Sequence, residues 1–213
     1  MNRASETRGY TTGSVRGYFA AYQSVLEKMP YAEIERVIAL LVQVREEARS
    51  VYLFGNGGSA ALASHFACDL GKGIPRGNET KLFRVISLCD NIPLMTAWAN
   101  DKSYDSIFSE QIKNLMVPGD IAIAISGSGN SPNVLRALET ARGMGGTTLG
   151  LTGFRGGKLK NLCDYCMIVP SDNMQVIEDF HLSICHAIFL GICQKIQQPV
   201  GMAVAAGAVL QSD

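Results

Sequence analysis

Apolar residues recur at helical spacing in two segments near the start of the chain. Residues 15–29 and residues 30–49 each place apolar side chains about every 3.6 positions, the period of an amphipathic helix. Pro30 suits the first turn of the second segment, because the backbone N–H has no intrahelical partner there. We therefore predict two helices ahead of any strand.

A different pattern begins at residue 50, where short aliphatic and β-branched runs alternate with helical ones. The runs expected to be strands are 51–54, 82–88, 121–125, 147–151 and 165–169. The segments expected to be helices are 59–72, 93–99, 104–116, a stretch ending at Arg142, and 174–197. Apolar strands that alternate with helices predict a parallel sheet covered on both faces. The expected fold is α/β: a doubly wound five-stranded parallel sheet sandwiched by helices, with extra N-terminal helices.

The chain has 213 residues, 47% of them apolar, which is enough to bury a sizeable core. We predict a single domain over residues 1–197, which includes the N-terminal helices of residues 15–49. Residues 198–213 are apolar but show no clear period, so we expect a C-terminal tail there.

Charge, hydropathy and cysteine content limit the possible partners and the cellular compartment of the protein. Nineteen Lys and Arg balance nineteen Asp and Glu, so no basic excess indicates a nucleic-acid partner. No run reaches the roughly 18 apolar residues of a membrane-spanning helix, and the first residues show no secretory signal. The six cysteines are not dense enough for a disulfide scaffold, so we interpret them as reduced, buried side chains. These features predict a cytoplasmic protein with neither a nucleic-acid nor a membrane partner.

Two of the predicted strands are each followed by a turn rich in Gly and Ser and then by a helix. The two segments read VYLFGNGGSAALASHF and IAIAISGSGNSPNVLRAL. Ligands of open α/β sheets bind beyond the carboxyl ends of the strands, which is where both turns lie.

The turn SGSGNS has the composition of an anion site. The hydroxyls of Ser126, Ser128 and Ser131 stand beside Gly127 and Gly129, which let the backbone approach a ligand. A helix follows at once, Ser131 can cap it, and a helix N-terminus attracts anions. The alternative is an ordinary sharp turn, which also favours Gly and Ser but does not need three hydroxyls.

The turn GNGGSA at residues 55–60 matches a dinucleotide fingerprint, G-x-G-x-x-A, in loose form. The acidic residue that such sites place about 20 positions further on is missing. The segment TGFRGGK at residues 152–158 lacks the spacing of a P-loop. We therefore expect no nucleotide cofactor.

Six segments, taken together, resemble the sugar isomerase (SIS) fold family, and within it the phosphoheptose isomerases. They are FGNGGSA (54–60), HFACDLGKG (65–73), WANDKSYDSIFSEQ (98–111), AISGSGNSPNVLRALE (124–139), GLTGFRGGKL (150–159) and IEDFHLSICH (177–186). They occur in family order over about residues 15 to 197. The resemblance implies a homotetramer with sites at subunit interfaces, which interconverts sedoheptulose 7-phosphate and D-glycero-D-manno-heptose 7-phosphate.

The resemblance also assigns roles to residues. The implied substrate-binding positions are Asn56, Gly57, Ser59, Lys72, Asp101, Ser126, Gly127, Ser128, Ser131 and Glu178. Among them the four serines would hold the phosphate, and Asn56 and Asp101 would position the sugar. The implied ligands of zinc or a similar divalent metal are His65, Asp69, Glu178 and His186. Asp69 and His186 are the implied base and acid.

The chain departs from the family pattern at three of these places. Asp69 stands where the family has Glu, so the carboxylate is one methylene shorter. Glu178 stands where the family commonly has Gln, which adds a negative charge. Gly73 aligns with an Arg of some members, and the adjacent Lys72 could serve in its place.

The residues themselves suit this chemistry. An aldose–ketose isomerisation needs a base at the carbon, an acid at the carbonyl oxygen and stabilisation of the enediolate, to which a metal can contribute. His65 and Asp69 are four positions apart on one predicted helix and share a face. Glu178 and His186 are eight apart, about 80° around theirs. Two imidazoles and two carboxylates are a plausible ligand set for a divalent ion.

Several of these residues have plainer interpretations. His65 and Asp69 can form an ordinary hydrogen bond on a helix face. We expect His181 at the surface or at an interface, and Cys163 and Cys166 in the core. Further candidates are Cys68 and Cys185 as soft metal ligands, and Trp98 and Tyr104 as packing residues, one of which could face the sugar.

Two classes of function therefore stay open. The first is a metal-assisted isomerase of a phosphosugar. The second is a non-catalytic module of the same fold that binds phosphosugars or proteins, because a fold alone does not fix a function. The sequence favours the enzyme, since both anion turns and a carboxylate–histidine pair are present together.

Overall fold

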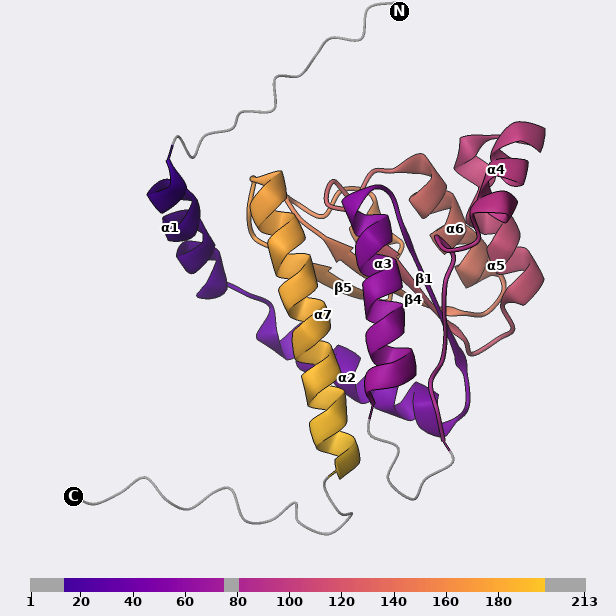
Figure 1. Cartoon of the computed structure of the whole chain (residues 1–213), viewed down its shortest axis with the longest axis horizontal. Coiled ribbons are helices and arrows are strands. Elements are labelled where there is room, and N and C mark those ends of the chain that lie inside the picture. Colours follow the sequence, from indigo (N-terminus) through magenta and orange to yellow (C-terminus); the bar gives the residue numbers. More distant parts are fainter. Residues whose placement is uncertain (1–13, 75–80, 198–213) are drawn as a thin grey trace, which may run out of the picture.

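The computed structural model describes residues 14–74 and 81–197 (Figure 1). The predicted C-terminal tail over residues 198–213 lies outside them. The helices are α1 (Val15–Leu26), α2 (Tyr31–Glu46), α3 (Gly58–Cys68), α4 (Ile92–Asp101), α5 (Ser109–Leu115), α6 (Pro132–Gly143) and α7 (Met174–Gln197), and the strands are β1 (Ser50–Gly55), β2 (Arg84–Ser87), β3 (Ile121–Ile125), β4 (Thr147–Thr152) and β5 (Tyr165–Ile168).

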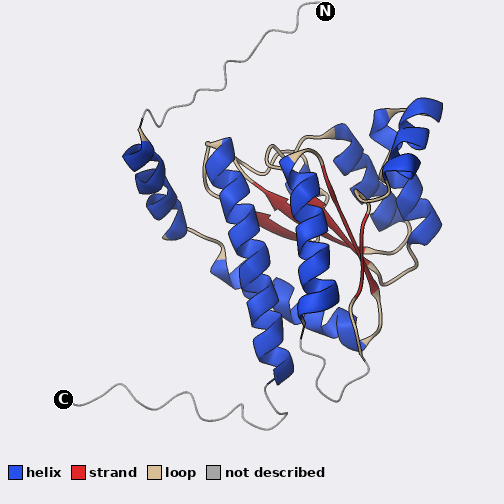
Figure 2. Ribbon diagram, in the orientation of Figure 1, coloured by secondary structure: helices blue, strands red, loops and turns tan. Residues whose placement is uncertain are grey.

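The five strands form one parallel sheet in the order β2-β1-β3-β4-β5 (Figure 2). The chain moves outward from β1 to β2 and then crosses back to β3, so the direction of winding reverses between β1 and β3. Such a reversal leaves a crevice at the carboxyl ends of the two strands, where ligands of doubly wound sheets bind. The structure confirms the predicted α/β fold with its extra N-terminal helices.

The central strands β1, β3 and β4 are almost entirely buried because helices cover both faces of the sheet, whereas the edge strands β2 and β5 are partly exposed. Leu53 and Ile123 belong to the core that packs against α2, α3 and α7. Their neighbours Phe54 and Ala124 point to the other core, which packs against α5 and α6. Figure 1 shows α3 and α7 side by side over the first face.

Helix α7 has 24 residues and contains an 18-residue window with a mean hydropathy of 1.5, so by length and composition it could cross a membrane. This corrects the expectation that no segment reaches that level. Eight of its residues, among them Phe180 and Ile188, are buried. Packing over the sheet therefore accounts for much of the apolar character of α7.

Two predicted helices end differently from the expectation. The segment 104–116 is a 3-10 turn, Tyr104–Ser106, followed by α5, and this bend buries Ile107 and Phe108 completely. The segment 59–72 is α-helical to Cys68 and continues as a π-helical turn over Asp69–Gly73. Short π-helical turns are frequent at functional sites, and this one begins at a predicted catalytic residue.

Candidate functional site

The two Gly- and Ser-rich turns lie side by side at the crevice between β1 and β3. The first turn passes through Gly57, whose φ of 57° favours glycine, and leads into α3. The second turn leads into α6, with Pro132 as the first helical residue. Together with the start of α7 they form a hollow of about 200 Å³, which we call the anion hollow, lined by Asn56, Ser59, Ile125, Ser126, Gly127, Ser128, Ser131, Met174 and Glu178.

The serine side chains of the anion hollow converge, as predicted. The hydroxyl oxygens of Ser126 and Ser131 are 3.3 Å apart, and Ser59 is buried beside them. Ser131 is the N-cap residue of α6, but its side chain makes no capping hydrogen bond. Its hydroxyl is therefore directed to the hollow rather than to the helix. Hydroxyls and free N–H groups at two helix N-termini are what an anion such as phosphate requires.

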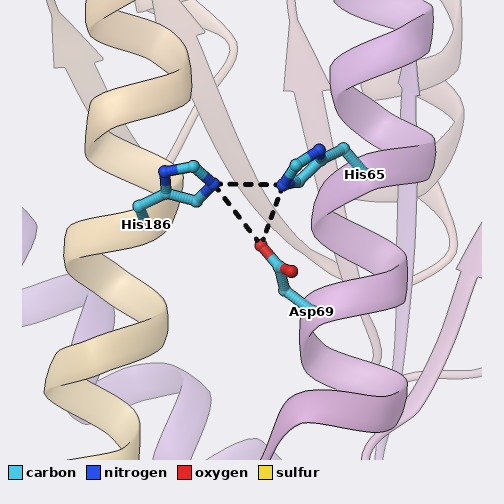
Figure 3. Close-up of side chains that lie close together, drawn as sticks. All are labelled: His65, Asp69 and His186. Atoms are coloured by element: carbon cyan, nitrogen blue, oxygen red, sulfur yellow. Dashed lines mark hydrogen bonds and ion pairs between the residues drawn. The ribbon is translucent and has the colours of Figure 1, made fainter.

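Three predicted metal ligands come together between α3 and α7 (Figure 3). The Nε2 atoms of His65 and His186 are 3.0 Å apart. The Oδ2 atom of Asp69 lies 3.4 Å from the first nitrogen and 3.9 Å from the second. Both imidazoles are about half exposed and the carboxylate is about one-quarter exposed. We call these three residues the triad.

The triad fits a divalent metal such as zinc. Two nitrogens bound to zinc at about 2.1 Å in a tetrahedral site lie roughly 3.4 Å apart, and the nitrogens here are 3.0 Å apart. The buried Oδ2 atom of Asp69 has no hydrogen-bond partner among the described residues, as expected for an oxygen that faces an ion. Two imidazoles and one carboxylate leave a fourth position for substrate or water, the pattern of catalytic zinc sites.

Glu178, the fourth predicted ligand, does not join the triad. It stands eight residues before His186 on α7, about 12 Å away along the helix axis. Its carboxylate instead lines the anion hollow, next to Gly58 at the start of α3. Within one chain the structure therefore unites three of the four predicted ligands.

A second hollow, of about 270 Å³, shares lining residues with the anion hollow and is also lined by His65 of the triad. It lies between α3 and α7 and is lined by Gly58, Ser59, Ala61, Leu62, His65, Glu178, Asp179, His181 and Leu182. Ser59 and Glu178 border both hollows, whereas His65 belongs to the triad. Ser59 and His65 are six residues apart on α3, or about 9 Å along its axis. A ligand with an anionic end in the first hollow can therefore extend toward the triad.

Three predicted substrate residues are not among the lining residues of either hollow: Gly57, which shapes the first turn, and Lys72 and Asp101, which lie further away. Lys72 is exposed in the π-helical turn after α3, three residues beyond Asp69. Asp101 is exposed at the end of α4, where its carboxylate accepts a hydrogen bond from the Asn100 side chain at 2.9 Å. The predicted roles of Lys72 and Asp101 therefore depend on a contact that the single described chain does not make.

Tyr104 is exposed, and its hydroxyl donates a hydrogen bond to Oδ1 of Asn56 at 3.0 Å. Of the two aromatic candidates it is the one that reaches the anion hollow. The indole nitrogen of Trp98 is buried without a hydrogen-bond partner among the described residues, and the Lys102 ammonium lies 5.0 Å from the ring centroid.

The expectation that His181 lies at the surface or an interface is wrong for the single chain. The residue is only 1% exposed, because this side of α7 packs against the sheet near Thr152. Burial lowers the pKa of His181 to about 4, and the Thr152 backbone opposes this shift in part. His181 is therefore a neutral group in the wall of the second hollow at neutral pH.

This burial predicts a stability that depends on His181 below neutral pH. The folded pKa lies below the ordinary value of 6.5, so between about pH 6.5 and 4 only the unfolded state binds the proton. As the pH is lowered from about 6.5 to 4, the free energy of unfolding should therefore decrease, by roughly 3 kcal/mol in total from this group. Urea unfolding from pH 7.5 to 4.5 should show a flatter profile for His181→Gln than for the unmodified protein. Parallel profiles would contradict the prediction.

The cysteines are free thiols, as expected, but not all are buried. Cys68 is exposed, which corrects its interpretation as a core residue, and Cys163 and Cys166 are only partly buried against the α5–α6 core. Cys185 is buried near Asp69, and desolvation raises the pKa of its thiol. Neither Cys185 nor Cys68 belongs to the group of side chains that gather at the triad, so the described part of the chain gives no support to a soft metal site.

Comparisons with known proteins point in one direction. A family model described as SIS domain matches residues 17–153. A phosphoheptose isomerase of Bradyrhizobium sp. is 35% identical over 198 residues, which cover 92% of this chain and 96% of that protein. The phosphoheptose isomerase of Paramagnetospirillum magneticum is 41% identical over 82% of this chain and 85% of its own length. The solved structure of the enzyme from Neisseria gonorrhoeae superposes with a TM-score of 0.77 at 31% identity, over 84% of this chain and 97% of that one.

Proposed function

This chain belongs to the SIS domain family, and on that basis we propose that it is an aldose–ketose isomerase of a phosphosugar. The proposed reaction interconverts sedoheptulose 7-phosphate and D-glycero-D-manno-heptose 7-phosphate. The observation that carries the proposal is a path along lining residues: Ser59 and Glu178 line both hollows, and His65 of the triad lines the second. A sugar with its phosphate on a terminal carbon has an anionic end and a distant reacting end, as this path requires.

The serines provide the first step, which is binding. Ser59, Ser126, Ser128 and Ser131 hold the phosphate at the starts of α3 and α6, where the helix dipoles favour an anion. The net charge of the chain is zero, so this local geometry supplies the attraction. Once the phosphate is bound, the carbon chain of the sugar is directed along α3 toward His65.

The acid and base of the triad provide the second step. We propose that the Asp69 carboxylate removes the proton from the carbon next to the carbonyl, while His186 donates a proton to the carbonyl oxygen. The enediol that results accepts a proton on the neighbouring carbon, and the other oxygen loses one, which completes the isomerisation. A carboxylate and an imidazole so close together divide these roles as general acid–base catalysis requires.

His65, Asp69 and His186 are also the residues that would hold a zinc or similar divalent ion. When bound, such an ion would polarise the sugar oxygens and favour the negatively charged enediolate. The family resemblance implies a set of four ligands, namely Asp69, Glu178 and the two imidazoles. The three of them that form the triad fit the ion by the distances described above.

We propose that the chain self-associates as a homotetramer with sites at subunit interfaces. Glu178 is too far along α7 to reach the triad of its own chain, so a second copy must provide it if it is a ligand. Large apolar side chains exposed on α1 and α7, among them Phe19 and Leu190, supply surface for such contacts. The cytoplasm is the proposed location, and a phosphosugar is the proposed small-molecule partner.

The test is incubation of the protein with sedoheptulose 7-phosphate in deuterated water, followed by NMR. We expect an aldose product with deuterium at the exchanging carbon. We also expect zinc or a similar ion in the purified protein, and loss of turnover when a chelator removes it. A chelated sample that regains turnover on addition of zinc controls for unfolding.

Each outcome separates the candidate functions. Deuterium exchange without a heptose product would support the enediol chemistry and contradict the assignment of a heptose phosphate as the substrate. The absence of both exchange and product would contradict the isomerase and favour a phosphosugar-binding module. Full turnover after chelation would contradict only the proposal that a metal ion is required, and would leave the isomerase in place.

A further inference from the structure

Asn133, near the start of α6, makes a reciprocal hydrogen-bonded pair with Asn56. Nδ2 of Asn56 donates to Oδ1 of Asn133 at 2.9 Å, and Nδ2 of Asn133 donates back to Oδ1 of Asn56 at 2.8 Å. Asn56 belongs to the turn after β1, whereas Asn133 follows the turn after β3. The pair therefore joins the two turns of the anion hollow directly. Asn133 is only 1% exposed, so water does not compete for these bonds.

The surroundings select one orientation of this pair. Turning both amides over at once would preserve the two mutual hydrogen bonds, so the pair alone leaves two arrangements. The backbone N–H of Val134 lies 3.0 Å from Oδ1 of Asn133 and can only donate. This N–H also donates to the Ser131 carbonyl at 3.1 Å, but a turned amide would place an NH₂ donor against it. The oxygen is therefore favoured at that place, which orients the Asn133 amide and, through it, the amide of Asn56.

This orientation decides what Asn56 offers to a ligand. Its Oδ1 atom already accepts hydrogen bonds from Asn133 and from the Tyr104 hydroxyl, which occupies both lone pairs. Its Nδ2 atom uses one hydrogen on Asn133 and keeps the other. Asn56 lines the anion hollow, so the group left for a ligand there is a donor.

We propose that Asn133 is a positioning residue that holds Asn56 as a hydrogen-bond donor to an oxygen of the bound phosphosugar. The inference rests on the proposed function, because it takes the occupant of the anion hollow to be a phosphosugar. Phosphate and sugar oxygens accept hydrogen bonds, so a donor at Asn56 favours binding whereas an acceptor beside a phosphate disfavours it.

A double-mutant cycle in the full-length protein tests this role. Asn56→Ala and Asn133→Ala are each expected to raise the KM for sedoheptulose 7-phosphate about tenfold, with kcat changed much less. Because Asn133 acts through Asn56, the double variant should also show an increase of about tenfold. Independent roles would give about a hundredfold. Calorimetric titration with inorganic phosphate provides a second binding readout that needs no turnover.

Asn133→Asp serves as the second variant, since it keeps the shape of the side chain and the acceptor for Val134. It removes the donor to Asn56 and places a carboxylate beside the Asn56 oxygen, so we expect a rise in KM at least as large as that of Asn133→Ala. Asn161→Asp, the same change at an exposed position outside both hollows, is the matched control and should leave the KM within about twofold.

The outcomes separate this inference from the function on which it rests. Unmodified protein that turns over the sugar phosphate, with additive effects of Asn56→Ala and Asn133→Ala, would overturn the positioning role and leave the isomerase in place. An unchanged KM for Asn133→Asp would overturn it as well. Unmodified protein that neither turns over sedoheptulose 7-phosphate nor binds phosphate would overturn both.

Discussion

Asp69→Asn is expected to reduce kcat by about 10²- to 10⁴-fold, the usual contribution of a positioned general base. The amide keeps the size of the side chain but cannot take the proton from carbon, and it is a weaker metal ligand. His186→Gln should have an effect of the same order, because it removes the group that protonates the carbonyl oxygen. The measurement is deuterium exchange and product formation from sedoheptulose 7-phosphate.

Binding should survive these changes, because the triad lies about 9 Å or more along α3 from the anion hollow. We therefore expect Asp69→Asn to bind inorganic phosphate within about threefold of the unmodified protein. Glu139→Gln, which neutralises an exposed carboxylate on α6, is the matched control and should keep full activity. Undiminished turnover by Asp69→Asn would remove the carboxylate from the mechanism and require another base.

Gly129→Ala is expected to have the largest effect on stability, with loss of phosphate binding. Gly129 has a φ of 65°, where an added Cβ costs about 1–2 kcal/mol. That Cβ would also lie 2.8 Å from the carbonyl carbon of Gly156 and 2.8 Å from Oγ1 of Thr152. Backbone cannot move aside as a flexible side chain can, so the total destabilisation should reach about 3 kcal/mol or more. Urea unfolding and titration with phosphate measure the two effects.

Gly143→Ala is the matched control for this substitution. Gly143 is the last residue of α6, and a Cβ built there meets no atom within 4 Å. Its backbone is not left-handed, so alanine should leave stability unchanged or raise it by up to about 1 kcal/mol. A Gly129→Ala variant as stable as Gly143→Ala would show that the turn after β3 can relax, contrary to its tight packing here.

The fold was predictable because its signals are local. A period of 3.6 residues marked α2 and α7, and short apolar runs marked β1 and β3. The anion hollow followed from two Gly- and Ser-rich turns and from the general rule that parallel strands share one carboxyl edge. Ser59 and Ser131 lie together in the structure for that reason.

The remaining features depend on how distant elements meet, which spacing along the chain does not reveal. The triad needs α3 and α7 to pack with His65 opposite His186, and only the folded core sets that register. Burial of His181 reflects the same packing. Asn133 was missed because its partner lies 77 positions away, and its place in the first turn of a helix gave no signal beyond an ordinary helix start.

Glu178 shows how one departure from the family pattern changes the site. Its negative charge borders the hollow that would hold a phosphate, a less favourable neighbour than the uncharged Gln it replaces. If a second copy uses this carboxylate as a metal ligand, as proposed, the ion offsets that charge. Metal and phosphosugar should then bind better together than separately.

The start of helix α7 packs closely against the end of β4. A Cβ at Gly153 would lie 2.6 Å from Cγ2 of Ile177, so the start of the helix is seated directly on the sheet beside the anion hollow. Helix α7 continues without a break from this anchored start to His186, so the contacts at its start also set the position of the imidazole. The start of α7 borders the anion hollow through Met174 and Glu178, so one anchored helix places both that border and the imidazole. We therefore expect the binding energy of the phosphate to align the reacting end of the sugar with His186. A sugar without the phosphate should lose kcat as well as affinity.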